Sequence, residues 1–311
     1  MMRKYFYLVP FALVLGLMLF AARPARTTAA KVLVLCDGKT YDGYIKTPFQ
    51  LRSPVHRDPN VKKIIRNCIF RNSKKPPIAI WDAQNVLIEG NTFENIRRGV
   101  AGKGVHAINI SCRGNCSIDR IVIRNNLFRY IGADGIQIGE VGRAIRHVRI
   151  VRNEFIGSED VGENGVDIKG VDGPIVVARN KMHGFRPCQD NQDCSGSPGE
   201  AMVVHEGGQS GVASNVRIKN NDFYDSIFGL TISDASENIL VVGNRFSDNQ
   251  DIGMLVDQTF SLRILSNVFS NNPTQLQIQD TPLPGGSCTL SGNTFIGNGE
   301  VVLKNSTCPN E

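Results

Sequence analysis

The sequence predicts an all-β protein, a right-handed parallel β-helix (solenoid) of about nine to ten coils. The first observation is a repeated phrase of the form apolar, any, apolar, two residues, Asn, any, apolar, as in residues 86–93. Eight asparagines mark its copies: Asn91, Asn126, Asn153, Asn180, Asn221, Asn244, Asn267 and Asn293. They stand 23 to 41 residues apart, which is the period of stacked units that cannot bury their apolar residues alone.

The second observation is an alternating run that follows each copy of the phrase. These runs are residues 107–110, 135–138, 165–168, 201–204, 229–232, 253–256 and 275–278. Alternation at period two is typical of strands with one buried face. The unequal spacing of the asparagines and the lack of helical apolar spacing disfavour a leucine-rich repeat.

The asparagine column has a physical role in such a stack. Side-chain amides at equivalent positions can hydrogen-bond along the axis at the ~4.8 Å strand spacing. The Phe two residues after most of these asparagines is expected to stack inside the coils.

The Asn-x-Phe repeat, over about residues 60 to 305, resembles the pectate-lyase-like superfamily of secreted β-helix proteins. That superfamily includes polysaccharide lyases, glycoside hydrolases, uronan epimerases and non-enzymatic surface proteins. The resemblance implies the β-helix fold and a carbohydrate partner.

The N-terminus predicts export. Arg3 and Lys4 precede an apolar stretch over residues 5–22, and small residues end at Ala30, so residues 1–30 are interpreted as a signal peptide. The alternative is a retained anchor, because the apolar run is long. Residues 31–311 are then one β-helix domain with an N-terminal cap region at 31–60 and a long loop at 183–200. We expect a secreted, periplasmic or cell-surface monomer without membrane contact after cleavage.

Eight cysteines fall into sequence-close pairs, which in an exported chain predict disulfides rather than metal ligands. The expected pairs are Cys36 with Cys68, Cys112 with Cys116, Cys188 with Cys194, and Cys288 with Cys308.

Charge says little about the partner. The net charge of +6 falls to +2 once the leader is removed, since 31 basic then stand against 29 acidic residues. Basic residues are spread through turns without interleaved aromatics, so nucleic-acid binding is not expected.

Alignment of the second strands predicts which side chains share the outer face. Since Ile and Val take the inner positions, their alternates point outward. One outward column is Ala79, Asn109, Gln137, Asp167, Val203, Thr231 and Leu255. The next is Trp81, Ser111, Gly139, Lys169, His205, Ser233 and Asp257. Six of these strands start with a small residue, Ala107, Gly135, Gly165, Ala201, Gly229 and Gly253. This column is expected to form an open floor for a long substrate.

The middle of this face is the predicted site. Its catalytic candidates are Lys169, His205, Asp167 and Glu206, and its substrate-binding candidates are Trp81, Glu140 and Asp234. Trp81 serves equally well as a cap on an end coil. Asp160, Glu163 and Asp167 offer the hard oxygen ligands that Ca²⁺ prefers. The long loop, tied by Cys188 and Cys194, is expected to cover the patch. His56, His106, His147 and His183 are interpreted as non-catalytic.

These residues suit β-elimination on a uronate polysaccharide. A base removes the proton α to a carboxylate, and cations stabilise the enolate. Lys169 is the first candidate for the base, with a pKa lowered by His205 and burial. The alternative has His205 as the base and Lys169 as the electrophile. A glycoside hydrolase using Asp167 with Glu206 or Glu140, an epimerase, and a non-catalytic binding protein remain open.

Overall fold

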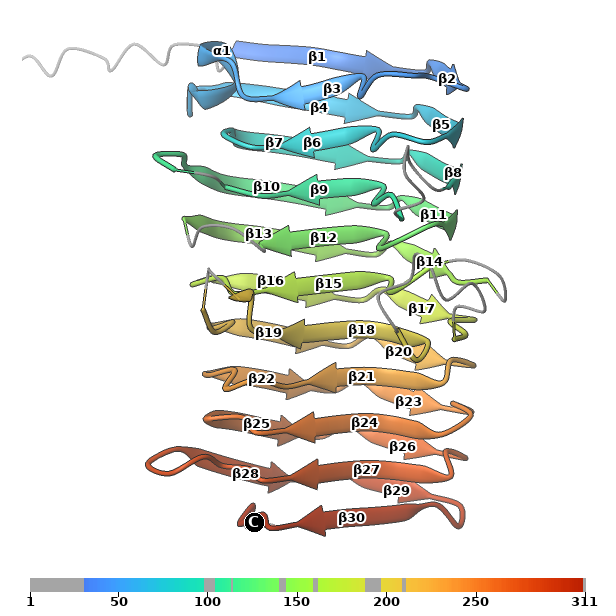
Figure 1. Ribbon diagram of the computed structural model, residues 1–311, viewed down its shortest axis with the longest axis vertical. Coiled ribbons are helices and arrows are strands. Elements are labelled where there is room, and N and C mark those ends of the chain that lie inside the picture. Colours follow the sequence, from blue (N-terminus) through green and yellow to red (C-terminus); the bar gives the residue numbers. More distant parts are fainter. Residues whose placement is uncertain are drawn as a thin grey trace, which may run out of the picture.

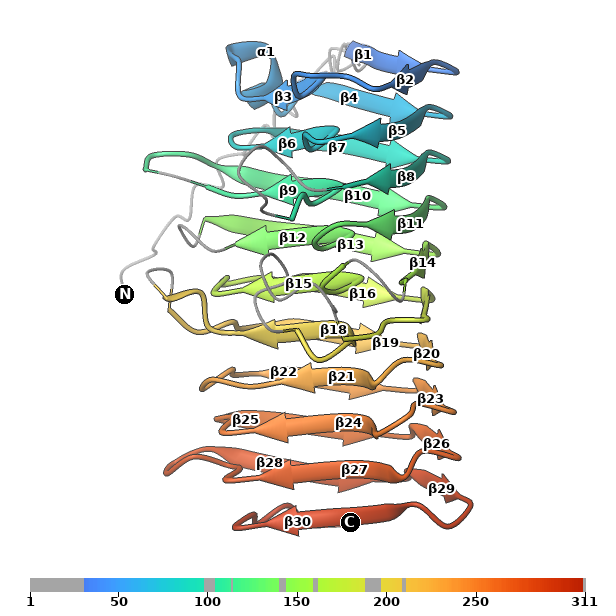
Figure 2. The same cartoon turned by 45° about the vertical axis from the view of Figure 1, so that its right-hand side comes forward.

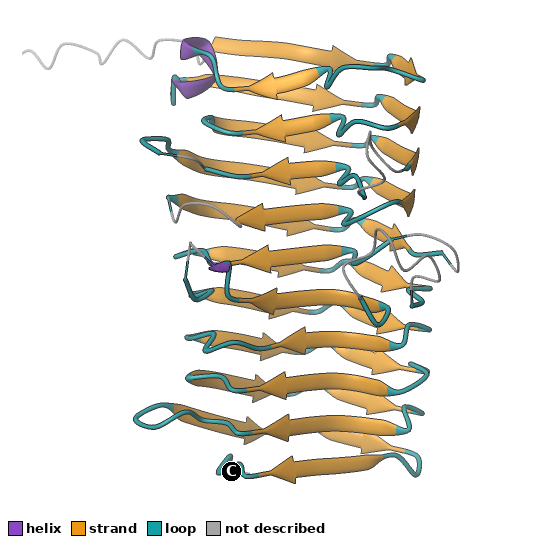
Figure 3. Cartoon of the chain, viewed as in Figure 1, coloured by secondary structure: helices purple, strands orange, loops and turns teal. Residues whose placement is uncertain are grey.

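The computed structural model describes residues 31–97, 104–112, 114–139, 144–158, 162–187, 197–208 and 211–309. Three parallel sheets of ten strands each form ten coils stacked along one axis (Figure 1). Strands and loops account for nearly all of the drawn chain (Figure 3). The prediction of an all-β parallel β-helix of nine or ten coils is therefore confirmed.

The chain visits the three sheets in the same order in every coil. Sheet A contains β1 (Lys31–Asp37), β4 (Val61–Arg66), β7 (Gln84–Glu89), β10 (Ile118–Arg124), β13 (Ile145–Val151), β16 (Ile175–Ala178), β19 (Val216–Lys219), β22 (Ile239–Val242), β25 (Ser261–Leu265) and β28 (Ser287–Ser291). Sheet B contains β2 (Thr40–Asp42), β5 (Ile69–Ser73), β8 (Thr92–Ile96), β11 (Leu127–Ile131), β14 (Glu154–Ile156), β17 (Lys181–His183), β20 (Asp222–Tyr224), β23 (Arg245–Ser247), β26 (Val268–Ser270) and β29 (Thr294–Ile296).

Sheet C carries the face predicted from register. It contains β3 (Phe49–Leu51), β6 (Ile78–Ile80), β9 (Ile108–Ile110), β12 (Ile136–Gly139), β15 (Val166–Lys169), β18 (Glu200–His205), β21 (Phe228–Ile232), β24 (Ile252–Asp257), β27 (Thr274–Gln279) and β30 (Glu300–Lys304). The only α-helix among the described residues is α1 (Pro54–Arg57). Strands β1, β2 and β3 precede it, one in each sheet, so residues 31–60 form the first coil. None of the helical structure described is long and apolar enough to span a bilayer. The predicted leader, residues 1–30, lies outside the described residues.

The eight asparagines form one continuous ladder between sheets A and B, as predicted. Each side-chain Nδ2 donates to the Oδ1 of the next asparagine at 2.9–3.0 Å, from Asn91 through to Asn293. The same Nδ2 also donates to a backbone carbonyl, as in Asn153 to Ile123. Both amide hydrogens and the oxygen have partners, so burial leaves none of these polar groups without a hydrogen bond.

The phenylalanines stack inside the coils in two runs. Phe70, Phe93, Phe128 and Phe155 form one, and Phe223, Phe246, Phe269 and Phe295 form the other, with ring centroids 4.6–5.1 Å apart. Met182 takes the Phe position in the coil between them.

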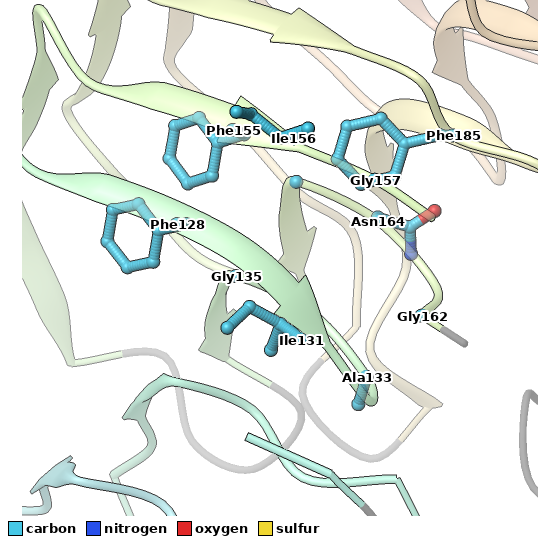
Figure 4. A pocket seen from close by; sticks show the side chains of 11 residues that line it. Phe128, Ile131, Ala133, Gly135, Phe155, Ile156, Gly157, Gly162, Asn164 and Phe185 are labelled. Atoms are coloured by element: carbon cyan, nitrogen blue, oxygen red, sulfur yellow. The ribbon is translucent and has the colours of Figure 1, made fainter. Parts of the chain in front are cut away.

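A small cavity lies at this interruption. Phe128, Phe155 and Phe185 line it (Figure 4), and its volume is about 10 Å³. That volume holds one water molecule at most, so the cavity is a packing defect and not a ligand site.

Three of the four expected disulfides are present. Cys36–Cys68 ties the first coil to the second, Cys112–Cys116 closes a loop after β9, and Cys288–Cys308 ties the last coil. Cys188 and Cys194 lie outside the described residues. The bonds at the two ends stabilise the coils that have a neighbour on one side only.

The small residues at the start of the sheet C strands do not form an open floor, and that prediction is wrong. Ala107 and Ala201 are fully buried, and a Cβ added at Gly135 would come within 2.8 Å of the Phe155 ring. At Gly165 the added Cβ would meet the carbonyl of Ala201 at 2.8 Å. The column is small because the Phe stack and the next coil occupy the space at this corner.

Candidate functional site

The outer face of sheet C has the register that the sequence predicted. Asp167 pairs with Gln137 on one side and Val203 on the other, and Lys169 pairs with His205. The strands β12, β15 and β18 lie next to one another in the middle of the stack (Figure 2). The Ile and Val residues at the inner positions of β15 and β18 are fully buried, which turns their alternates outward.

Asp167 joins the two cationic candidates. Its Oδ2 lies 3.0 Å from Lys169 Nζ, and its Oδ1 lies 3.1 Å from His205 Nε2. On the other side of the imidazole, Nδ1 lies 3.8 Å from Asp234 Oδ2. Asp167 is almost fully buried, whereas the side chains of Lys169 and His205 are 21% and 27% exposed. The carboxylate is thus held beneath two side chains that a ligand can reach.

A second polar group lies beside this one, at the entry to the sheet C strands. The carboxyl of Asp134 is fully buried; its Oδ1 accepts a hydrogen bond from Asn164 Nδ2 at 2.9 Å. Its Oδ2 lies 3.0 Å from His106 Nδ1, and Glu163 is close enough to interact electrostatically with both residues. The site therefore contains more buried carboxyls than the sequence interpretation included.

The buried carboxyls raise one another's pKa. Burial and the Asp134 carboxylate raise the pKa of Glu163 to about 7. Burial and the Asp167 carboxylate raise the pKa of Asp134. Burial also raises the pKa of Glu200, at the start of β18. Near neutral pH, Glu163 therefore exchanges a proton with solvent readily, unlike an ordinary surface glutamate.

The pKa of Lys169 shifts in the direction opposite to the sequence expectation. Burial disfavours the ammonium, but the Asp167 and Asp134 carboxylates outweigh burial and raise the pKa. The expectation neglected Asp134 and did not count the effect of the Asp167 charge on the Lys169 ammonium. Lys169 is therefore a permanent cation at neutral pH.

His205 is tuned differently. Burial lowers its pKa, but the hydrogen bond and charge of Asp167 outweigh burial, so the pKa lies above the ordinary value. Histidine is the side chain whose ordinary pKa lies nearest physiological pH, so the two Asp167 interactions favour its protonated form there.

The remaining predicted residues are dispersed. Glu206 follows β18 and is exposed, and Asp234 is half-exposed beside His205. Trp81 lies on the same face, three strands away from β15, past β9 and β12. Glu140 and Asp160 lie outside the described residues. The long loop returns to the site, since Ser197 Oγ donates to the carbonyl of Glu163 at 3.2 Å.

The predicted calcium set is incomplete in the described part of the chain. There, no group of three or more His, Cys, Asp or Glu side chains has a geometry that could hold a metal ion. Glu163 and Asp167 are both present, but Asp160 is not described. The described residues alone therefore do not make up the predicted calcium set, and the proton transfers derived below use no metal ion.

Asp134, His106 and Asn164 were missed, although the sequence contains a signal for them. Each stands immediately before the small residue that opens a sheet C strand. Reading the column one position upstream gives His106, Asp134, Asn164 and Glu200 in consecutive coils. Alternation places side chains only within a strand, whereas His106, Asp134 and Asn164 lie at the corner that precedes it.

Glu163→Gln is expected to stabilise the fold at high pH only. The folded chain keeps the Glu163 proton up to about pH 7, while the unfolded chain releases it near the ordinary value of 4.5. Ionisation in the folded state therefore costs free energy as pH rises through this window. Near pH 4 the variant and the parent should unfold alike. At pH 8 the variant should gain roughly 1–3 kcal/mol in the free energy of unfolding, measured by urea denaturation.

The exposed Glu237 provides the matched control. Glu237→Gln removes the same charge from the surface and should leave stability nearly unchanged at both pH values. An equal gain in both variants would show that net charge, and not burial of Glu163, is responsible.

The chain is similar in structure to several β-helix proteins. Azotobacter vinelandii mannuronan C-5 epimerase AlgE4, A-module, aligns at a TM-score of 0.53 with 13% identity, over 91% of this chain and 89% of the epimerase chain. A variant of the periplasmic alginate epimerase AlgG aligns at 0.52 with 15% identity, over 80% and 70%. XylC in complex with xylose aligns at 0.51 with 12% identity, over 78% of this chain and 52% of XylC, so the chain spans about half of XylC. At these identities the likeness shows the fold.

Sequence comparison gives a complementary result. No curated protein sequence matches the chain. A family model described as the right handed beta helix region matches residues 55–162 and 187–308, which is well over half of the chain. Together with the ten-coil stack and its asparagine ladder, this match shows that the chain belongs to the right-handed β-helix family.

Proposed function

We propose that this protein is a polysaccharide lyase that removes the proton α to the carboxylate of a uronate unit and cleaves the chain by β-elimination. The observation that carries the proposal is the buried Asp167 carboxylate, which holds a lysine and a histidine side by side on an accessible face. This arrangement supplies a fixed cation and an oriented base, the two groups that this proton abstraction needs.

His205 acts as the base in this proposal. With Nε2–H donating to Asp167, the neutral imidazole keeps its lone pair on Nδ1, on the side away from Asp167. A carboxylate partner that fixes the tautomer and orientation of a histidine also stabilises the imidazolium that forms. His205 Nδ1 takes the proton, and the Asp167 carboxylate then faces a full positive charge.

Lys169 stabilises the negative charge that develops. When the C–H bond breaks, its electron pair moves toward the uronate carboxyl, and the Lys169 ammonium neutralises it. The bond to the leaving glycosidic oxygen then breaks, a carbon–carbon double bond forms, and the oxygen takes a proton. Glu163, with a pKa of about 7, carries a proton in part of the molecules at neutral pH and is the candidate donor.

Calcium is an additional part of the proposal. An ion on Asp160, Glu163 and Asp167 would increase the positive charge at the substrate carboxylate. Activity that survives a chelator would show that Lys169 suffices. Activity that needs Ca²⁺ would add the ion to the mechanism. It would also exclude Glu163 as the proton donor, because a carboxylate that binds the ion has no proton to give.

A uronan epimerase is the second candidate, because two structurally similar proteins are named as a mannuronan C-5 epimerase and an alginate epimerase. Epimerisation shares the abstraction step and returns a proton to the opposite face of the carbon without breaking the chain. The xylose complex of XylC also favours a saccharide ligand. The three disulfides among the described residues are typical of an oxidising compartment, so we propose that the protein works outside the cytoplasm. We also propose that it is a monomer.

One assay separates these activities. The protein is incubated in deuterium oxide with alginate, pectate, glycosaminoglycans or a neutral glycan. Ultraviolet absorbance from unsaturated ends indicates a lyase, and deuterium at the inverted carbon of an intact chain indicates an epimerase. Binding without either signal would identify a non-catalytic carbohydrate-binding protein and overturn the proposed reaction.

Asp167→Asn should shift the pH dependence of the reaction to lower pH. Asp167 is the main group that raises the pKa of His205, so its neutralisation lets the imidazole lose its proton at lower pH. The ascending limb of kcat/KM against pH should move to lower pH. The plateau value of kcat/KM should fall, because the imidazolium loses its stabilising partner. A limb that stays in place would exclude His205 as the titrating base.

A further inference from the structure

A depression lies on the same face as the candidate site, at the N-terminal end of the stack. It is an open cleft of about 580 Å³ beside strands β6 and β9. Arg52, Arg57, Trp81 and Asp82 line one part of it, and Asn109 and Ser111 line another. These residues come from three consecutive coils, so the register of the solenoid builds the cleft.

The lining is cationic and aromatic. The Arg52 guanidinium lies 4.8 Å from the centre of the Trp81 ring, a cation–π contact. Arg57 Nε lies 2.5 Å from Asp82 Oδ2, and the Asp82 side chain is only 11% exposed. Two arginines against one aspartate leave the cleft with a net charge of +1. Among the described residues, no carboxylate lies within ion-pair distance of Arg52.

This chemistry selects an anionic, partly apolar ligand. A guanidinium presents paired N–H donors that match both oxygens of a carboxylate. An indole ring packs against the apolar C–H face of a sugar. The amide of Asn109 and the hydroxyl of Ser111 provide hydrogen bonds for sugar hydroxyls. A uronate unit carries all three kinds of group.

The cleft is in line with the candidate site. Ala79, Asn109, Gln137 and Asp167 pair in one row across β6, β9, β12 and β15. Three strand steps of ~4.8 Å place Trp81 about 14 Å along the axis from Lys169. An oligomer longer than a disaccharide is needed to reach both places.

We infer that this cleft is a distal subsite that binds the carboxylate of a uronate unit on the polymer whose other unit reacts at His205. The reaction at His205 rests on the proposed function, whereas binding of a uronate in the cleft does not. Arg52 binds the carboxylate, Trp81 supports the sugar ring, and the pair Arg57–Asp82 keeps the wall of the cleft in place. The subsite fixes the direction of the polymer along sheet C.

Trp81 is the only tryptophan in the chain, so fluorescence excited at a wavelength that tyrosine does not absorb reports on the cleft alone. We would titrate the protein with tetrasaccharides of galacturonate and of mannuronate, and with cellotetraose as the neutral probe. An acidic tetrasaccharide should change the fluorescence with saturation, and cellotetraose should not. Arg52→Ala should raise the Kd about tenfold or more, because it removes a charge-assisted hydrogen-bond donor. Arg52→Lys should bind with intermediate affinity, since it keeps the charge but not the paired donors.

The matched control is Arg263→Ala, an exposed arginine on β25 in sheet A. It removes the same charge away from sheet C and should leave the Kd unchanged. Since Arg52 is exposed, its loss should leave the unfolding midpoint in place, which circular dichroism checks. If Arg52→Ala and Arg263→Ala weaken binding equally, or if cellotetraose binds as well as the uronates, the subsite is excluded.

Failure of the subsite and failure of the proposed reaction give different results. An uronate response at Trp81 in a protein that turns over no substrate would keep the subsite and overturn the reaction. Turnover with a KM that Arg52→Ala does not change, and without a fluorescence response, would keep the reaction and overturn the subsite. If both hold, KM for wild type should fall once the oligomer is long enough to span both places, and Arg52→Ala should abolish this fall.

Discussion

Replacement of His205 by asparagine is expected to lower kcat by about 10²–10⁴-fold, the usual contribution of a general base. Two carboxylates contact its ring, Asp167 at 3.1 Å and Asp234 at 3.8 Å. Folding should be unaffected, because the ring is partly exposed at the end of a strand. Steady-state kinetics on the substrate identified by the polymer assay measures the loss.

His147→Asn is the matched control. His147 is exposed on β13 and is also paired with an aspartate, since its Nδ1 lies 2.6 Å from Asp119 Oδ1. The same substitution there should leave kcat unchanged. Lys169→Gln should also lower kcat. The ascending limb should persist but move to higher pH, because the Lys169 charge lowers the pKa of His205. If His205→Asn retains the activity and Lys169→Gln removes the pH limb, the two roles must be exchanged.

The repeat was sufficient to predict the fold because its most regular residue bonds to its own copy. Asn126 receives a hydrogen bond from Asn91 and donates one to Asn153, so a sequence period becomes a spatial column. Once that column is fixed, the alternation of the following strand has one possible register. This is why the pairing of Lys169 with His205 was predictable to the residue.

The electrostatics of the site could not be predicted in the same way. Alternation says that Asp167 points outward, but it does not say that neighbouring coils and loops cover it. Asp134 and Asn164 lie at a corner, where the period of two no longer applies, so pattern alone gives no direction for their side chains. The pKa of Lys169 depends on these buried neighbours, and its direction was therefore mispredicted.

Asn153→Ala is expected to destabilise the protein by about 2–6 kcal/mol, more than most single substitutions do. The Asn153 Oδ1 accepts two hydrogen bonds from Asn126, one from its backbone N–H at 3.0 Å and one from its side-chain Nδ2 at 2.9 Å. Alanine leaves both donors of a buried residue without that partner, and each such loss costs about 1–3 kcal/mol. The carbonyl of Ile123 loses its bond from Asn153 as well. Urea denaturation measures the change.

The loss should also be local before it is global, because each coil of a solenoid contacts only its neighbours. Amide hydrogen exchange should therefore accelerate first in β13, in the coil of Asn153, and in β10, in the preceding coil that loses its hydrogen bonds to Asn153, and last in β28. Asn298→Ala, in an exposed turn of the last coil, should change stability by no more than about 0.5 kcal/mol. If Asn153→Ala is as mild as that control, water replaces the amide and the ladder is not what holds the coils in register. A large loss of unfolding free energy with equal acceleration of exchange in all coils would instead show that the ten coils unfold as one cooperative unit. A change near the ladder would then also affect the strands that carry Lys169 and His205.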